Sequence, residues 1–133
     1  MSWDSYIDNL IGHTGGACDK AAIIGKDGSK WTTDSHPEAL KITPSEASAI
    51  GKAMRSGDFT TFQSSGIVIA GVKYMFLRGD DGVVLGKRKD QGAITLQASG
   101  TAVVIGHTKE GMSQGNTNKG VAVIAEYLTS MGM

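Results

Sequence analysis

Residues 66–107, GIVIAGVKYMFLRGDDGVVLGKRKDQGAITLQASGTAVVIGH, decide the fold of this chain, because short apolar runs alternate there with turns that contain glycine. Each run is about five residues long, which is a common length for a β-strand and too short for most helices. Asp81-Gly82 and Ser99-Gly100 are typical of the tight turns that join neighbouring antiparallel strands. The pattern therefore predicts an antiparallel meander with strands at 66–70, 73–78, 83–87, 93–98 and 101–107.

Helical patterns surround this meander on both sides. Residues 2–12 repeat apolar side chains with a helical period, and we expect Ser2 to cap that helix. A helix that begins at Pro44 and stops near residue 57 is indicated by the threonine before the proline and by the apolar positions that follow it. Residues 116–131 carry another apolar stripe with the same period, so a third helix is expected near the C-terminus.

Two further extended runs precede the second helix, at 18–24 and 30–33, and the Lys26-Asp27-Gly28 turn signal between them predicts a strand pair. The order helix, two strands, helix, five strands, helix is typical of the α+β class. We therefore expect a central antiparallel β-sheet of about seven strands. The N- and C-terminal helices should pack together on one face and the further helix on the other, within a single domain that spans residues 1–133.

The composition excludes several broad classes of protein. Thirteen basic residues balance 13 acidic residues, so no overall charge draws the chain to nucleic acid or to an anionic membrane. Cys18 is the only cysteine, which excludes an internal disulfide and a cysteine-based zinc cage, and in a predicted strand it should be a small buried residue rather than a nucleophile. The first residues show no export signal, and no apolar run reaches the roughly 18 residues that span a bilayer. We expect a cytoplasmic protein.

No catalytic motif is present in the sequence. His13, His36 and His107 are scattered, and no nucleophile elbow, phosphate-binding loop or dinucleotide fingerprint occurs. We therefore expect no catalytic residue, no metal, no cofactor and no enzymatic activity. A hydrolase built from Asp80, Asp81 and His107 is the enzymatic alternative, but a turn already explains the two aspartates.

The eight aromatic residues are distributed unevenly. Trp3 and Tyr6 share one side of the first predicted helix, and Tyr127 lies on the flank of the apolar stripe of the last one. If the two terminal helices lie side by side, these rings and Trp31 could line a shallow trough of the kind that receives a polyproline II helix. Ordinary packing of the same rings is the alternative that these residues alone leave open.

Five stretches that span nearly the whole chain match one known family in order and spacing. They are Ser2-Trp3-Asp4-Ser5-Tyr6-Ile7-Asp8; Ala21-Ala22-Ile23-Ile24-Gly25 with Asp27-Gly28 and Trp31; Ile69-Ala70-Gly71-Val72-Lys73-Tyr74; Leu85-Gly86-Lys87-Arg88-Lys89; and Ala125-Glu126-Tyr127-Leu128. Through these stretches the chain resembles the profilins, whose element order is the one predicted above.

The resemblance implies three binding sites. The poly-proline groove corresponds to Trp3, Tyr6, Trp31, Tyr127 and Met133, where Met133 stands in a position at which some profilins end in an aromatic residue. Contacts with actin correspond to Lys73, Arg78, Arg88, Lys109, Asn118 and Lys119. Phosphatidylinositol bisphosphate binding corresponds to Lys87, Arg88 and Lys89, although strand alternation would send Arg88 to the opposite side from its two neighbours.

The implied function is that of a cytoskeleton-associated adaptor. It would bind monomeric actin, regulate actin polymerisation and nucleotide exchange on actin, and bind proline-rich segments of actin-regulatory proteins with its other face. A small-ligand sensor of similar α+β layout is the alternative binding function. It would need a cavity inside the sheet, whereas the inward positions Ile67, Ile69, Val103 and Ile105 suggest filled space.

Overall fold

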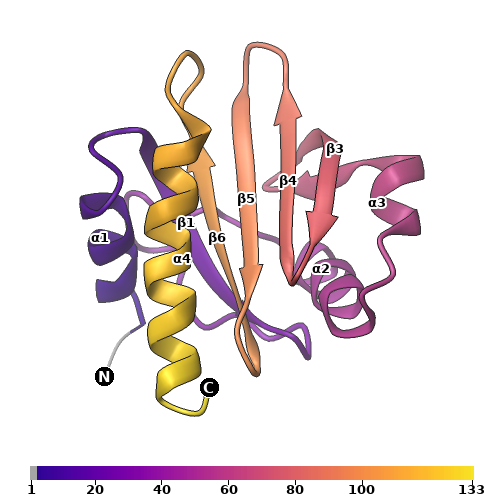
Figure 1. The fold of residues 1–133 in the computed structure, drawn as a ribbon, viewed down its shortest axis with the longest axis horizontal. Helices are drawn as coiled ribbons and strands as arrows, with labels where there is room; N and C mark the ends of the chain where they lie inside the picture. The colour runs from indigo at the N-terminus through magenta and orange to yellow at the C-terminus, as the bar shows by residue number, and fades with distance from the viewer. Residues whose placement is uncertain (1–2) are drawn as a thin grey trace.

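A six-stranded antiparallel sheet, in the order β1-β6-β5-β4-β3-β2, forms the centre of the protein. The computed structural model describes residues 3–133, and Figure 1 shows α1 and α4 side by side across one face of the sheet with α2 behind it. The elements are α1 (Ser5–Gly12), β1 (Cys18–Gly25), α2 (Pro44–Ser56), α3 (Thr60–Ser65), β2 (Ile67–Ile69), β3 (Val72–Asp80), β4 (Val83–Arg88), β5 (Gly92–Ala98), β6 (Ala102–Thr108) and α4 (Gln114–Ser130).

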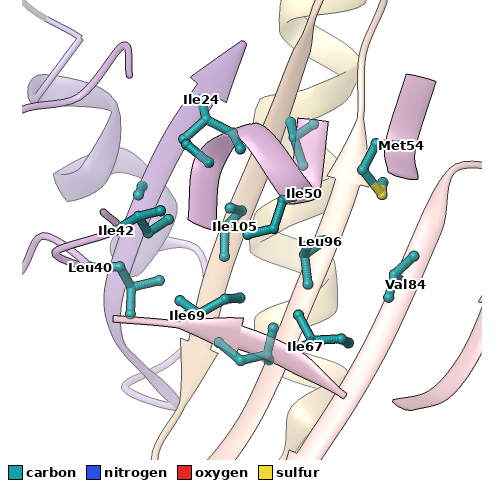
Figure 2. Close-up of a cluster of buried hydrophobic side chains, with 14 of the residues drawn as sticks. Ile24, Leu40, Ile42, Ile50, Met54, Ile67, Ile69, Val84, Leu96 and Ile105 are labelled. Atoms are coloured by element: carbon teal, nitrogen blue, oxygen red, sulfur yellow. The ribbon is translucent and has the colours of Figure 1, made fainter. Parts of the chain in front are cut away.

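The sheet is buried on both faces where β1 and β6 cross it. In β6, Val103 and Ile105 join the core beneath α2, whereas Ala102 and Val104 join the core beneath α1 and α4. This double burial explains why β6 is a continuous apolar run instead of an alternating one. Figure 2 shows the first core, in which Ile50 of α2 lies over the strands, and the inward side chains Ile67, Ile69, Val103 and Ile105 are all fully buried in it.

Glycines allow α4 to approach its neighbours closely. A Cβ atom on Gly120 would lie 2.5 Å from Thr14 Cγ2 and 2.8 Å from the Leu10 carbonyl oxygen at the end of α1. A Cβ atom on Gly106 of β6 would lie 2.8 Å from Val121 Cγ2. These separations are below van der Waals contact, so only glycine permits the close packing of α1, α4 and β6.

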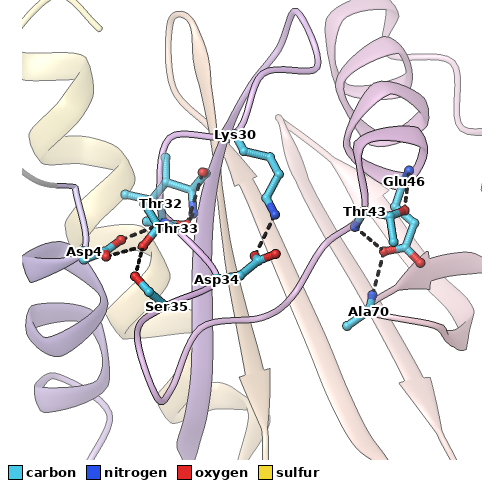
Figure 3. Close-up of polar contacts among 10 residues, drawn as sticks. Asp4, Lys30, Thr32, Thr33, Asp34, Ser35, Thr43, Glu46 and Ala70 are labelled. Carbon is cyan, nitrogen blue, oxygen red and sulfur yellow. Dashed lines mark hydrogen bonds and ion pairs between the residues drawn. The ribbon is translucent and has the colours of Figure 1, made fainter.

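The start of α2 follows the sequence prediction and also supports a distant turn. Thr43 Oγ1 accepts a hydrogen bond from Glu46 N, and Glu46 Oε1 accepts one from Thr43 N, which completes a capping box. The same carboxylate accepts a bond from the backbone N–H group of Ala70 at 2.8 Å (Figure 3). It also accepts one from the N–H group of Gly71 at 3.0 Å. Because Ala70 and Gly71 both have positive φ angles, Glu46 holds the strained β2–β3 turn as well as its own helix.

The structure corrects the prediction of a seventh strand at 30–33. Only Lys30 forms an antiparallel bridge, with Ile24, while the N–H groups of Trp31 and Thr32 both donate to the single carbonyl of Ile23. Two donors that converge on one acceptor turn the chain away from the sheet, and this places Trp31 beside α1 instead of in a strand.

The helix predictions also differ from the structure in detail. The first helix was expected at 2–12 but begins at Ser5, with Asp4 as its N-cap residue; the expected cap, Ser2, lies outside the described residues. The helix α3 was not predicted, because six residues are too few to show a helical period. It begins after Asp58, whose carboxylate accepts from both the backbone and the hydroxyl of Thr60.

Candidate functional site

Four aromatic rings from three separate segments meet at one end of the α1–α4 face. The ring centroids of Trp3 and Tyr6 are 5.0 Å apart, and those of Trp3 and Trp31 are 4.8 Å apart. Tyr127 of α4 extends the cluster, with its centroid 6.2 Å from that of Tyr6. We call this surface the aromatic trough. Its tilted pairs have the spacing at which aromatic side chains attract one another.

Two contacts hold the tryptophans of the trough together. Asp4 accepts hydrogen bonds from Thr33 N at 2.8 Å and Thr33 Oγ1 at 2.5 Å, which ties the segment after Trp31 to the start of α1 (Figure 3). These hydrogen bonds, the side-chain one first, lower the pKa of Asp4. On the other side, a Cβ atom on Gly25 would lie 2.4 Å from Asp27 Oδ1, 2.5 Å from Ser29 Oγ and 3.0 Å from Trp31 Nε1, so this glycine leaves room for the turn after β1 and for the indole.

The residues Asp4, Thr33 and Gly25 were not predicted as parts of the site. Asp4 and Thr33 are 29 positions apart, and no local sequence pattern reports a contact over that distance. The only signal is their closeness to the two tryptophans, one residue from Trp3 and two residues from Trp31.

Met133 packs against the same core cluster as Trp3 and Trp31. Its side chain packs against the core beneath α1 and α4, and its carbonyl oxygen accepts from Ser99 Oγ at 2.9 Å and Thr101 Oγ1 at 2.7 Å. The β5–β6 turn therefore fixes the backbone of Met133, from which its flexible thioether side chain extends.

The exposure of the rings leaves the trough open to a ligand. Tyr6 is 8% exposed and forms the floor, whereas Tyr127 is 49% exposed and forms a wall. Burial, together with the neighbouring Tyr127 hydroxyl, raises the pKa of Tyr6, which stays a neutral donor. Within residues 3–133 the indole N–H groups of Trp3 and Trp31 have no hydrogen-bond acceptor, so both can donate to a ligand carbonyl.

The six predicted actin contacts lie on the strands and loops away from the trough. Lys73, Arg78 and Arg88 are exposed on β3 and β4, Lys109 is exposed after β6, and Lys119 is exposed on α4. The sixth residue, Asn118 of α4, is half-buried, because its side-chain oxygen accepts from Thr95 Oγ1 on β5 at 2.5 Å. That bond leaves the amide N–H₂ group of Asn118 as a donor for a partner.

The basic run 87–89 does not form one continuous patch. Lys87 lines a cavity with Lys109 beside the start of α4. Arg88 Nη1 instead donates to the Lys73 carbonyl at 3.0 Å. Burial on the α2 side raises the pKa of Tyr74, and the nearby Arg88 guanidinium opposes that rise. Lys89 lies beyond the last residue of β4, so the alternation of side chains along the strand places only Lys87 and Arg88 on opposite sides of the sheet.

The histidines take part in structural contacts. His107 Nδ1 lies 2.6 Å from Asp19 Oδ1 and its Nε2 lies 2.6 Å from the Gln91 carbonyl oxygen, so its partner is neither Asp80 nor Asp81 of the proposed hydrolase. Asp80 pairs with Val83 at the β3–β4 turn, where Asp81 has a positive φ angle, as the turn prediction requires.

His36 belongs to the one group of possible metal ligands among residues 3–133, which also contains Asp8 and Glu38. His36 Nδ1 accepts from Glu38 N, so Nε2 carries the ring proton and donates to Asp8 Oδ1 at 3.0 Å. A hydrogen-bonded link between α1 and the loop after β1 explains this group without a metal. Cys18 is buried as predicted, and burial raises the pKa of its thiol to about 11.

Comparison with known proteins decides which family has this architecture. A profilin family model matches residues 1–133. The chain belongs to the profilin family. A profilin from Heliocidaris crassispina is 61% identical, with both chains covered completely. None of the helices among residues 3–133 has the length and hydropathy needed to cross a membrane.

Solved profilin structures have the same fold. Acanthamoeba castellanii profilin II superimposes with a TM-score of 0.85 at 33% identity, covering 99% of this chain and 100% of that one. Mouse profilin IIa, solved in complex with a double repeat from the FH1 domain of mDia1, superimposes with a TM-score of 0.76 at 25% identity over both complete chains. The α+β class, the antiparallel sheet and the paired terminal helices are therefore confirmed.

Proposed function

We propose that this protein is a non-enzymatic adaptor that binds monomeric actin with one surface and proline-rich segments with the aromatic trough. One observation carries the second half of this function. Trp3, Tyr6, Trp31 and Tyr127 come from the turn before α1, from α1, from the loop after β1 and from α4, and they form a single partly exposed cluster. A structural core would bury all four rings, whereas Tyr127 is half exposed.

The trough suits a polyproline II helix for two physical reasons. Such a helix already has its bound conformation in solution, so little conformational entropy is lost when it docks on the rings. Its carbonyl groups have no internal partners, and the indole N–H groups of Trp3 and Trp31 can donate to them. Met133 adds an apolar contact for a prolyl ring at the end of the trough.

Membership of the profilin family supports the proposal that the protein binds actin, and the exposed cations support a location for the contact. Lys109 and Lys119 flank the start of α4, and Lys73, Arg78 and Arg88 belong to the adjoining strands. We propose that these residues and Asn118 contact actin, where positive charge would speed association with an acidic surface. Actin would hold the nucleotide, and tighter binding to its open form would accelerate exchange without any catalytic group here.

Two parts of the function are narrower proposals. Association with the actin cytoskeleton in the cytoplasm would follow from the actin contact. Binding of phosphatidylinositol bisphosphate would use Lys87, Arg88 and Lys89, and their separation over two sides of the sheet favours weak, salt-sensitive attraction. Co-sedimentation with vesicles that contain this lipid, at low and high salt, tests the second proposal.

Retention on poly-L-proline beads tests the trough. We expect the protein to be retained and to be eluted by free poly-proline, with a saturable change in tryptophan fluorescence, because both tryptophans line the trough. Slower assembly of pyrene-labelled actin in the presence of the protein tests the other surface. A folded sample that passes through the beads would disprove the first activity without affecting the second.

A further inference from the structure

The aromatic trough continues into a charged cavity beyond Trp31. This cavity has a volume of about 490 Å³ and is lined by Lys26, Asp27, Trp31, Arg55, Gly100 and Thr101. Trp31 is a wall of the trough on one side and a wall of the cavity on the other. Trp31 is the one lining residue that also belongs to the positions that we assigned to proline-rich ligands.

Hydrogen bonds join the cavity to the Met133 end of the trough. Lys26 N donates to the Thr101 carbonyl at 2.8 Å, and the Thr101 hydroxyl donates to the Met133 carbonyl at 2.7 Å. Figure 1 shows the end of β1, the β5–β6 turn and the C-terminus at the same end of the molecule. An extended peptide that leaves the trough past Trp31 therefore enters this cavity.

The cavity contains two cations, Lys26 and Arg55, and one carboxylate, Asp27, so positive charge is in excess. Arg55 Nη1 donates to the Lys26 carbonyl, which holds the guanidinium of α2 beside the turn after β1. Within residues 3–133 the Lys26 ammonium has no ion-pair or hydrogen-bond partner. The Ser29 hydroxyl and N–H donate to Asp27 Oδ1 at 2.6 and 3.0 Å and, with the charge of Arg55, lower the pKa of Asp27, so this one carboxylate balances only one of the two cations.

We propose that this cavity binds an acidic residue that flanks the proline-rich segment of a partner. The rings would bind the prolines, and Lys26 and Arg55 would bind the adjacent carboxylate, as Arg and Lys do in charge-assisted pairs. This inference rests on the proposed binding of proline-rich segments, and it adds a selectivity among them. Because a polyproline II helix can enter an aromatic trough in either direction, the acidic residue can lie at either end of the prolines.

Matched peptides test the proposal. Each contains about ten prolines and carries, at its N- or C-terminal end, either a pair of glutamates or a pair of glutamines, which have the same shape without the charge. Tryptophan fluorescence gives the dissociation constant of each peptide. We expect one glutamate peptide to bind about threefold to fivefold more tightly than its glutamine match at low salt, and the preference to vanish at about 0.5 M salt.

Variants separate the cavity from the trough. The double variant Lys26→Gln/Arg55→Gln should bind the glutamate and glutamine peptides equally, while Arg55→Lys should keep most of the preference because it keeps the charge. Lys41→Gln removes an exposed cation from the opposite end of the β1 strand and should keep the full preference. The measured quantity is the ratio of the dissociation constants of the glutamine and glutamate peptides. A general loss of affinity changes both constants and leaves this ratio unaltered.

Three results overturn the proposal. If no proline peptide binds, the proposed function itself is wrong and the inference falls with it. If the glutamine peptides bind and neither glutamate peptide binds more tightly, the trough is a proline site and the cavity adds nothing. If neither glutamate peptide is preferred but vesicles of anionic lipid bind through Lys26 and Arg55, the cavity belongs to a membrane contact instead.

Discussion

The aromatic trough and the basic surface of β3, β4 and the start of α4 are built in opposite ways. In the trough, each ring contacts another ring, and Asp4, Thr33 and Gly25 fix the two tryptophans from outside. On the basic surface, most of the cations extend into solvent, and the ion pair of Arg78 with Asp80 spans 3.9 Å. A preorganised site loses less entropy on binding than one with free side chains.

This difference predicts how strongly each surface should respond to the loss of one residue. One residue of the trough supports several others, so its loss should remove the whole activity. One cation of the basic surface contributes a screened charge, so its loss should change the association rate and leave the fold intact. The predictions below test this contrast, in order of decreasing effect.

Trp3→Ala should have the largest effect, because it removes a ring that contacts both Tyr6 and Trp31. We expect affinity for poly-proline to fall by at least about 30-fold, as for a central aromatic anchor. The fluorescence of Trp31, then the only tryptophan, can follow the titration. Val68→Ala, which shortens an exposed side chain on β2, is the matched control and should bind normally. Equal loss of actin binding by Trp3→Ala would contradict the separation of the two surfaces.

Glu46→Ala should reduce stability and leave both binding surfaces unaffected. The carboxylate of Glu46 accepts bonds from three backbone N–H groups, of Thr43, Ala70 and Gly71, and their loss should lower the free energy of unfolding by about 2 kcal/mol. Urea denaturation measures this change. Glu46→Gln retains one acceptor oxygen, so its free energy of unfolding should lie between those of the unaltered protein and of Glu46→Ala. A loss of proline affinity in folded Glu46→Ala would show that the two sides of the sheet are coupled.

Lys119→Glu should weaken actin binding without a change in stability. Reversal of one exposed charge beside the proposed contact should slow association about threefold to tenfold at low salt. Stopped-flow measurements at two salt concentrations separate this effect from a loss of packing, since only the electrostatic part is screened. Unaltered association at low salt would remove Lys119 from the proposed actin surface.

Asp4→Asn should have the smallest effect and a defined pH dependence. The folded-state pKa of Asp4 lies below its unfolded value, so the contact with Thr33 stabilises the protein above the unfolded value and is lost as the pH falls through the folded one. The variant should therefore be less stable by up to about 1 kcal/mol at neutral pH. The difference in melting temperature should begin to shrink below about pH 4 and disappear only at lower pH, where Asp4 is protonated in the folded protein as well. If the difference in melting temperature persists in acid, the lost charge of Asp4 is not its cause.

Features that depend on neighbouring residues were predictable from the sequence. The Thr43-Pro44 start of α2, the turn at Asp81-Gly82 and the strands of the meander all result from local backbone preferences. The resemblance to profilins supplied the trough residues, and the structure brings all five of them to one surface.

Tertiary structure alone decided how the trough is assembled. The segment 30–33 has the composition of a strand, yet it leaves the sheet, because Trp31 packs, partly buried, against the core beneath α1 and α4 and Thr33 is bound by Asp4. The cavity of Lys26 and Arg55 likewise joins residues from the turn after β1, from α2 and from the β5–β6 turn. A sequence determines which backbone conformations are favoured locally, whereas contacts between residues about 30 positions apart form only when the whole core packs and offsets the entropy of closing the loops between them.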